Sequence, residues 1–193
     1  ADIETFLACN PDCRRKGLQE VMMPGAARFA LDAAFWDLEA KALGKRVWQM
    51  IGGFAPQPQI TAFTLSLADP DSMEKKAREN AFRPVLKIKL GGGEEDLERL
   101  RAVRRGAPNT RIIVDANEGW SPEMITPFSA ELATLGVEMI EQPIPAAADA
   151  VLAECTHPVP ICADDSCHTR ADLDPLEGRH GMVHIKVDKT GDR

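Results

Sequence analysis

Three acidic residues and three lysines stand out because each follows, or lies within, a short apolar run. Asp115 follows the run 112–114, Glu141 follows 137–140 and Asp164 follows 161–163. Lys87 and Lys89 lie at the end of a run that begins at residue 85, and Lys186 follows the run 183–185. The interval between successive charged ends is about 25 residues, a spacing typical of repeated strand–helix units.

If the three acidic residues lie on adjacent strand ends, their carboxylates converge on one point. Three carboxylates with room for water provide the oxygen ligands that Mg²⁺ prefers, and burying them together without a cation would be costly. Asp115, Glu141 and Asp164 are therefore the candidate metal ligands. Any one of them alone would more often be a helix cap or a solvated turn residue.

The lysines could supply a base. Residues i and i+2 of a strand face the same side, so Lys87 and Lys89 should point the same way while Ile88 packs against helices. A lysine acts as a base only when it is neutral, and a neighbouring Lys87 together with a divalent cation favours the neutral amine of Lys89. The alternative is a solvent-exposed edge strand, where lysines are common.

The elements that must position these side chains alternate along the chain. We predict strands over 59–67, 85–90 and 111–116 and three more that end at Glu141, Asp164 and Lys186, with helices over 69–82, 94–105 and 121–135. Such repeats predict an α/β fold with a parallel sheet, and charges at the carboxyl ends of successive strands favour a closed (β/α) TIM-like barrel. A doubly wound open sheet is the alternative, although no G-x-G-x-x-G follows the first strand. Six strands are present where eight are needed, so we expect the printed chain to be part of a longer protein.

A different pattern precedes residue 59. Pro24 and Gly25 open a helix whose apolar residues follow helical spacing as far as Ala42, Gly44 ends it, and a short helix over 47–51 follows. The segment 56–58 resembles a linker. We therefore predict two domains, 1–58 and 59–193.

Composition excludes several classes of protein. The net charge of −7 disfavours a nucleic-acid surface, and no apolar run approaches the ~20 residues that a membrane helix needs. Five cysteines without paired spacing suggest neither a disulfide framework nor a zinc site. We expect a cytoplasmic protein. Gly91–Gly93 predict a plain turn, since the acidic residues 94–96 would repel a phosphate, and of the four histidines only His168 is expected near the site.

The order Lys-x-Lys, Asp, Glu, Asp, Lys at successive strand ends resembles the muconate-lactonizing subgroup of the enolase superfamily. Residues 24–38 are similar to the last helix of that family's α+β capping domain, and 113–118 to its first metal-ligand segment. The segments 140–143, 161–168 and 185–191 are similar to those of dipeptide epimerases that act on L-Ala-D/L-Glu. Two departures are Asp165, where Glu is frequent, and Gly191–Asp192, where the family continues Gly-Gly.

This resemblance implies a mechanism. Mg²⁺ on the three carboxylates would bind the substrate carboxylate and stabilise an ene-diolate. Lys89 and Lys186 would act as the two bases on opposite faces of the substrate, while Lys87 and Thr64 would contact it. The implied partner is a small dipeptide or other carboxylate, and we expect a homo-oligomer. A cycloisomerase, an o-succinylbenzoate synthase of the same superfamily and a catalytically incomplete remnant are the alternatives.

Overall fold

The computed structural model describes residues 3–190 and divides the chain into two compact units, residues 1–58 with 185–193 and residues 59–184. The division between Pro58 and Gln59 falls in the segment that we interpreted as a linker. The second unit ends at His184, whereas we expected the corresponding domain to run to residue 193. Residues 191–193, which hold the second departure from the family pattern, lie outside the described residues.

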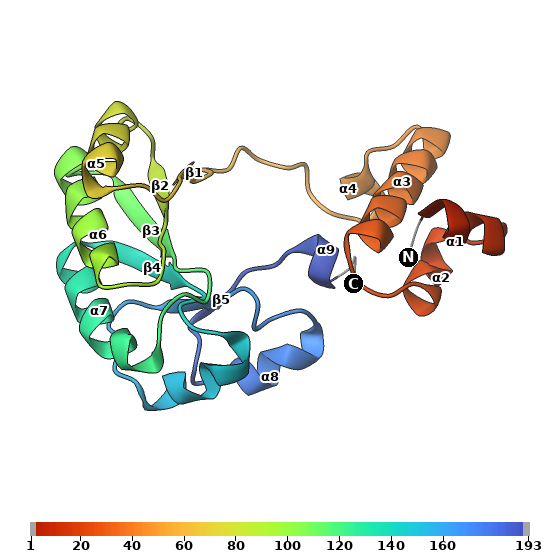
Figure 1. Ribbon diagram of the computed structural model, residues 1–193. Helices are drawn as coiled ribbons and strands as arrows, with labels where there is room; N and C mark the ends of the chain where they lie inside the picture. The colour runs from red at the N-terminus through yellow and green to blue at the C-terminus, as the bar shows by residue number, and fades with distance from the viewer. Residues whose placement is uncertain (1–2, 191–193) are drawn as a thin grey trace. The chain divides into compact units, whose positions relative to one another are not determined.

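The first unit is helical (Figure 1). Its helices are α1 (Ile3–Cys9), α2 (Arg15–Val21), α3 (Ala26–Leu43), α4 (Val47–Met50) and α9 (Val187–Thr190). The predicted long helix is confirmed as α3, and Gly44 ends it with φ 62° because glycine adopts the left-handed conformation without strain. A small apolar core joins α2 to α3 through Leu18, Met22 and Leu31.

The second unit contains a six-stranded parallel sheet with the order β1-β2-β3-β4-β5-β6. The strands are β1 (Phe63–Leu65), β2 (Val85–Lys89), β3 (Arg111–Asp115), β4 (Val137–Glu141), β5 (Ile161–Ala163) and β6 (Met182–Val183). Each strand pairs with the next strand in the chain, which excludes the doubly wound alternative because that topology reverses direction within the sheet. The sheet is the succession of strands that a (β/α) barrel requires, and among the described residues it is open between β1 and β6.

Helices follow the strands as predicted. They are α5 (Pro70–Glu79), α6 (Glu95–Gly106) and α7 (Pro122–Thr134), followed by the shorter η1 (Ala146–Glu154), η2 (Arg170–Asp172) and α8 (Leu173–Leu176). Figure 1 shows α5, α6 and α7 along one side of the sheet. Leu86, Ile88 and Val114 are fully buried in the core on that side, whereas Lys87 and Lys89 are only partly buried, which confirms the alternation predicted for β2.

The two outer strands are shorter than predicted. The strand expected over 59–67 is regular only over Phe63–Leu65, and the strand expected to reach Lys186 ends at Val183. In the part of the chain that the structure describes, each of these strands has a neighbour on one side only, so fewer main-chain hydrogen bonds hold its ends in the extended conformation. Ser121 precedes α7 as predicted, but its side chain makes no capping hydrogen bond. No helix in the described part of the chain is long and apolar enough to cross a membrane.

Candidate active site

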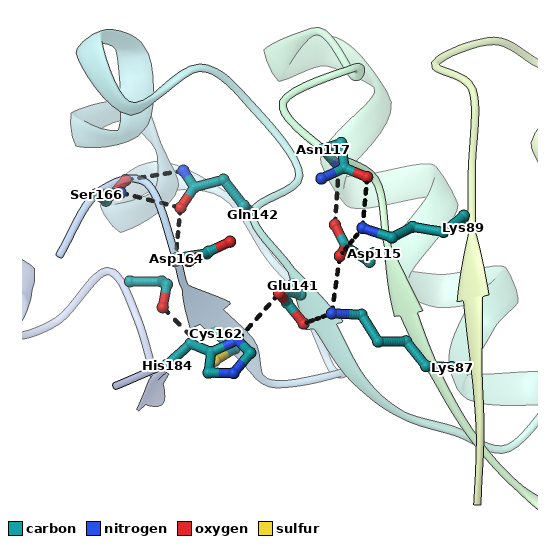
Figure 2. A network of polar contacts seen from close by, with 11 residues as sticks. Lys87, Lys89, Asp115, Asn117, Glu141, Gln142, Cys162, Asp164, Ser166 and His184 are labelled. Carbon is teal, nitrogen blue, oxygen red and sulfur yellow. Dashed lines mark hydrogen bonds and ion pairs between the residues drawn. The ribbon is translucent and has the colours of Figure 1, made fainter. Parts of the chain in front are cut away.

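The candidate site lies at the carboxyl ends of β2 to β5, where sheet register brings charged residues side by side. Lys89 pairs with Asp115 across β2 and β3, and Asp115 pairs with Glu141 across β3 and β4. Asp164 follows β5 directly. Figure 2 shows these side chains facing one another from neighbouring strands. Together with Lys87, which contacts Asp115 and Glu141, the sheet therefore brings together five of the residues that were singled out from the sequence.

Lys87 bridges two of the carboxylates. Its Nζ lies 2.8 Å from Asp115 Oδ2 and 2.6 Å from Glu141 Oε2, and both carboxylates are almost completely buried. Burial by itself would lower the pKa of Lys87, but the hydrogen bonds and charges of Asp115 and Glu141 outweigh it, so this pKa is raised. Burial likewise raises the pKa of Asp115, and the hydrogen bonds from Lys87 and Lys89 reverse the effect and lower it. The pair is therefore ionised near neutral pH.

Lys89 contacts Asp115 and the loop that follows it. Its Nζ lies 2.6 Å from Asp115 Oδ2 and 2.9 Å from Asn117 Oδ1, and the Asn117 N–H donates to Asp115 Oδ1 at 3.1 Å. Asn117 and the next residue, Glu118, have positive φ angles of 47° and 61°. Such conformations cost free energy in residues other than glycine and concentrate at functional sites. The strained loop holds the Asn117 amide against the amine of Lys89.

Glu141, Asp164 and His184 form a second group. Each has a ligand atom within 4.8 Å of the other two, and His184 Nδ1 lies 3.1 Å from Glu141 Oε1. The His184 N–H donates to the Ala163 carbonyl at 2.7 Å, which fixes the backbone beside β5. Burial and then the charges of Glu141 and Asp164 raise the pKa of the nearby Cys162 thiol to about 12. This thiol is therefore protonated and unreactive beside a concentration of negative charge.

The donor set fits a hard divalent cation. Three buried carboxylates face two lysines, so a negative charge remains that a cation can neutralise. Glu141 and Asp164 are already close enough to share an ion. Asp115 adjoins Glu141 in the sheet, and in this structure its carboxylate accepts from both lysines instead.

Three further residues were expected at or near the site: Thr64, Lys186 and His168. Thr64 aligns with Lys87 in the sheet register but is exposed on the short strand β1. Lys186 belongs to the first unit, whereas the second unit ends at His184. His168, the histidine expected near the site, is exposed, and its N–H donates to Asp172.

Sequence reasoning missed His184 and Asn117. The i, i+2 rule that we applied to Lys87 and Lys89 would have found His184, because it lies two residues before Lys186 in the expected sixth strand. Asn117 carried a weaker signal, because asparagine adopts the left-handed conformation more readily than most residues other than glycine. Its role depends on a left-handed turn, and glycine, the usual mark of such a turn, is absent at this position.

Sequentially wound parallel strands with lysines and carboxylates at their carboxyl ends define the active-site arrangement of a (β/α)-barrel enzyme. Residues 71–192 match the family described as Enolase C-terminal domain-like. The match covers more than half of the chain, and the chain belongs to this family.

Known relatives are similar over most of the chain. It is 46% identical to an L-Ala-D/L-Glu epimerase of Escherichia coli (strain K12), over 92% of this chain and 56% of that protein. A crystal structure of an enolase family member from Agrobacterium tumefaciens with homology to dipeptide epimerases contains bound sodium and L-Ala-L-Glu. This chain matches it with a TM-score of 0.92 at 51% identity, over 98% of this chain and 58% of that one. A dipeptide epimerase from Enterococcus faecalis V583, complexed with Mg and L-Leu-L-Tyr, has a TM-score of 0.86 at 29% identity, with coverage of 98% and 58%. The chain spans little more than half the length of these relatives.

Proposed function

We propose that the protein to which this chain belongs is a Mg²⁺-dependent epimerase of a dipeptide of the L-Ala-D/L-Glu type. The observation that carries the proposal is the contact of Lys87 and Lys89 with buried carboxylates at adjacent strand ends. A positioned base that removes the α-proton and positive charge close to the carboxylate both stabilise the transition state of epimerisation next to a carboxylate. The similarity to dipeptide epimerases over 92% and 98% of the chain supports the choice of substrate class.

In this proposal Asp115, Glu141 and Asp164 hold the ion. When bound, Mg²⁺ would bind the substrate carboxylate and supply positive charge where negative charge develops during proton removal. Lys87 lies between Asp115 and Glu141, and its hydrogen bond helps to lower the pKa of Asp115, which favours the ionised carboxylate that binds a cation.

Lys89 and Lys186 are the proposed bases. Lys89 is partly exposed, with 35% of its side chain accessible, so its amine can meet a substrate on the open side of the sheet. Its amine contacts both Asp115 and Asn117 (Figure 2). Lys186 is assigned from the family resemblance, and it would return a proton to the opposite face of the substrate. Thr64, which is exposed on β1, is the proposed additional contact to the substrate.

A cycloisomerase or an o-succinylbenzoate synthase would use the same ligands and the same lysines. Turnover of a panel of dipeptides, measured beside a cycloisomerase substrate and an o-succinylbenzoate precursor, separates these activities. We expect turnover of dipeptides with a C-terminal acidic residue. Turnover of the other two substrate classes alone would contradict the proposed substrate.

The two-base assignment is tested by Lys89→Ala and Lys186→Ala variants of the full-length protein in deuterated water. Each should abolish epimerisation, because one face of the α-carbon loses its proton carrier. Each variant should still incorporate deuterium at the α-carbon of one stereoisomer of the substrate. The stereoisomer that incorporates deuterium in the Lys89→Ala variant should be the opposite of the one in the Lys186→Ala variant. Equal incorporation from both stereoisomers in each variant would rule out the scheme.

A further inference from the structure

The side chain of Gln142 connects the loops after β4 and β5. It is 1% exposed and uses its full hydrogen-bonding capacity. Its Oε1 accepts from the Asp164 N–H at 2.7 Å and from the Ser166 N–H at 3.1 Å, and its Nε2 donates to Ser166 Oγ at 2.8 Å and to the Ile144 carbonyl at 3.1 Å. Figure 2 shows the amide lying between Ser166 and Asp164.

The backbone of Gln142 explains why a side chain is needed there. The Gln142 N–H donates to the Cys162 carbonyl at 2.9 Å, as in a regular parallel ladder, and in such a ladder the next bond would join the Asp164 N–H to the Gln142 carbonyl. Gln142 has a φ of 35°, and its carbonyl instead accepts from the Glu118 N–H at 2.8 Å. The side-chain Oε1 takes the place of the missing main-chain acceptor.

This substitution lies between two proposed metal ligands. Glu141 directly precedes Gln142, and Asp164 is the residue whose N–H the Gln142 amide holds. The regular pairing of β4 with β5 ends at Glu141 and Cys162, so the Gln142 side chain continues the connection where the strand pairing stops.

We infer that Gln142 is a positioning residue that fixes the Asp164 backbone relative to Glu141 and thereby sets the spacing of their carboxylates. The inference takes the metal ion and its ligands from the proposed function. The hydrogen bonds of Gln142 are observed in the structure and do not depend on that function. Groups that orient metal ligands without touching the ion typically change metal affinity by about 10- to 100-fold when they are replaced.

The test uses Gln142→Met, which keeps the length of the side chain and removes every hydrogen bond that it makes. Ser166→Ala is the matched control, because it removes the bond to Ser166 Oγ and leaves Oε1 facing the Asp164 N–H. Two quantities are measured for each protein: Mg²⁺ affinity by calorimetric titration, and exchange of the Asp164 and Ser166 amide hydrogens by NMR without metal. The Ile140 amide, which donates to Pro160 within the sheet, is the internal reference.

For Gln142→Met we expect Mg²⁺ affinity to fall by about 10-fold or more, and Asp164 and Ser166 exchange to accelerate by about the same factor while Ile140 exchange is unchanged. For Ser166→Ala we expect Mg²⁺ affinity to stay within about 2-fold of the unsubstituted protein. Gln142→Glu, which retains an acceptor for both amides, should restore their slow exchange.

Several results would overturn the inference or separate it from the proposed function. Equal acceleration at all three amides would mean that the substitution only destabilises the fold, and unchanged Mg²⁺ affinity in Gln142→Met would mean that Gln142 does not position the ligands. If the unsubstituted protein binds no Mg²⁺, the proposed function fails, and the amide exchange alone then decides whether Gln142 holds Asp164.

Discussion

Removal of the Asp96 carboxylate should destabilise the second unit more than any surface substitution. Asp96 is fully buried at the start of α6 and accepts from four donors on three segments. The N–H groups of Gly91 and Gly92 donate at 3.0 and 2.9 Å, the Trp120 indole at 3.0 Å and Arg99 Nη1 at 3.0 Å. The carboxylate therefore ties the loop after β2 to the loop after β3.

The magnitude follows from these contacts. Hydrogen bonds to a charged group contribute about 1.5–3 kcal/mol each, so four of them represent roughly 6–12 kcal/mol. Burial of the carboxylate offsets several kcal/mol of this, and loss of one partner from a buried ionic group typically costs about 3–5 kcal/mol. We expect Asp96→Ala to lower the free energy of unfolding by about 3–5 kcal/mol. This is a large share of the roughly 5–15 kcal/mol that is typical of a domain.

Urea unfolding followed by circular dichroism measures the effect. Asp69→Ala is the matched control, because Asp69 also accepts from a backbone N–H at a helix start, that of Ser72 at 2.9 Å, but its side chain is not buried. Trp120→Phe removes one of the four donors and keeps an aromatic ring against Phe128, so its cost should be smaller and should not add to that of Asp96→Ala. A loss in Asp96→Ala no greater than in Asp69→Ala would refute the reasoning.

Three further outcomes are expected. Glu141→Gln should weaken Mg²⁺ binding markedly in a calorimetric titration, and unchanged affinity would mean that Glu141 does not hold the ion. Arg104 donates to five backbone carbonyls around the loops that follow α6 and α7, so Arg104→Met should cost about 2–3 kcal/mol in urea unfolding, and a loss below 1 kcal/mol would contradict that role. Burial lowers the pKa of His180 below its usual 6.5. When the pH falls through 6.5, His180 therefore takes up a proton in the unfolded state before it does so in the folded state. Stability is then complete above pH 6.5 and falls below it by at most about 1.4 kcal/mol per pH unit, and His180→Phe should remove that part of the pH dependence of urea unfolding.

The strand–helix repeat was predictable because its signals are local. Apolar runs such as 112–114 and 137–140 predict strands wherever they lie, and Pro122 and Gly136 mark the two ends of α7. The convergence of Asp115 and Glu141 also followed from the sequence, since the ends of neighbouring parallel strands meet at one edge of a sheet.

The loops could not be predicted in the same way. Asn117, Glu118 and Gln142 have positive φ angles without being glycine, and tertiary hydrogen bonds hold them there. The turn predicted over Gly91–Gly93 is confirmed. The N–H groups of Gly91 and Gly92 donate to the Asp96 carboxylate within the chain. The carboxylate of Asp96 occupies the position that a phosphate would take in an anion-binding loop.

These loops are joined laterally, each to the next. Asp96 connects the loops after β2 and β3, and Gln142 connects those after β4 and β5. Glu118 connects the loops after β3 and β4, because its N–H donates to the Gln142 carbonyl at 2.8 Å and its Oε1 accepts from the Ala146 N–H at 2.7 Å. Sheet pairing alone fixes a site residue only as far as the last ladder hydrogen bond, and Asp164 and Asn117 lie beyond that point. Sheet register therefore brings the lysines, Asp115 and Glu141 together, and buried polar side chains in the loops hold Asp164 and Asn117 beside them.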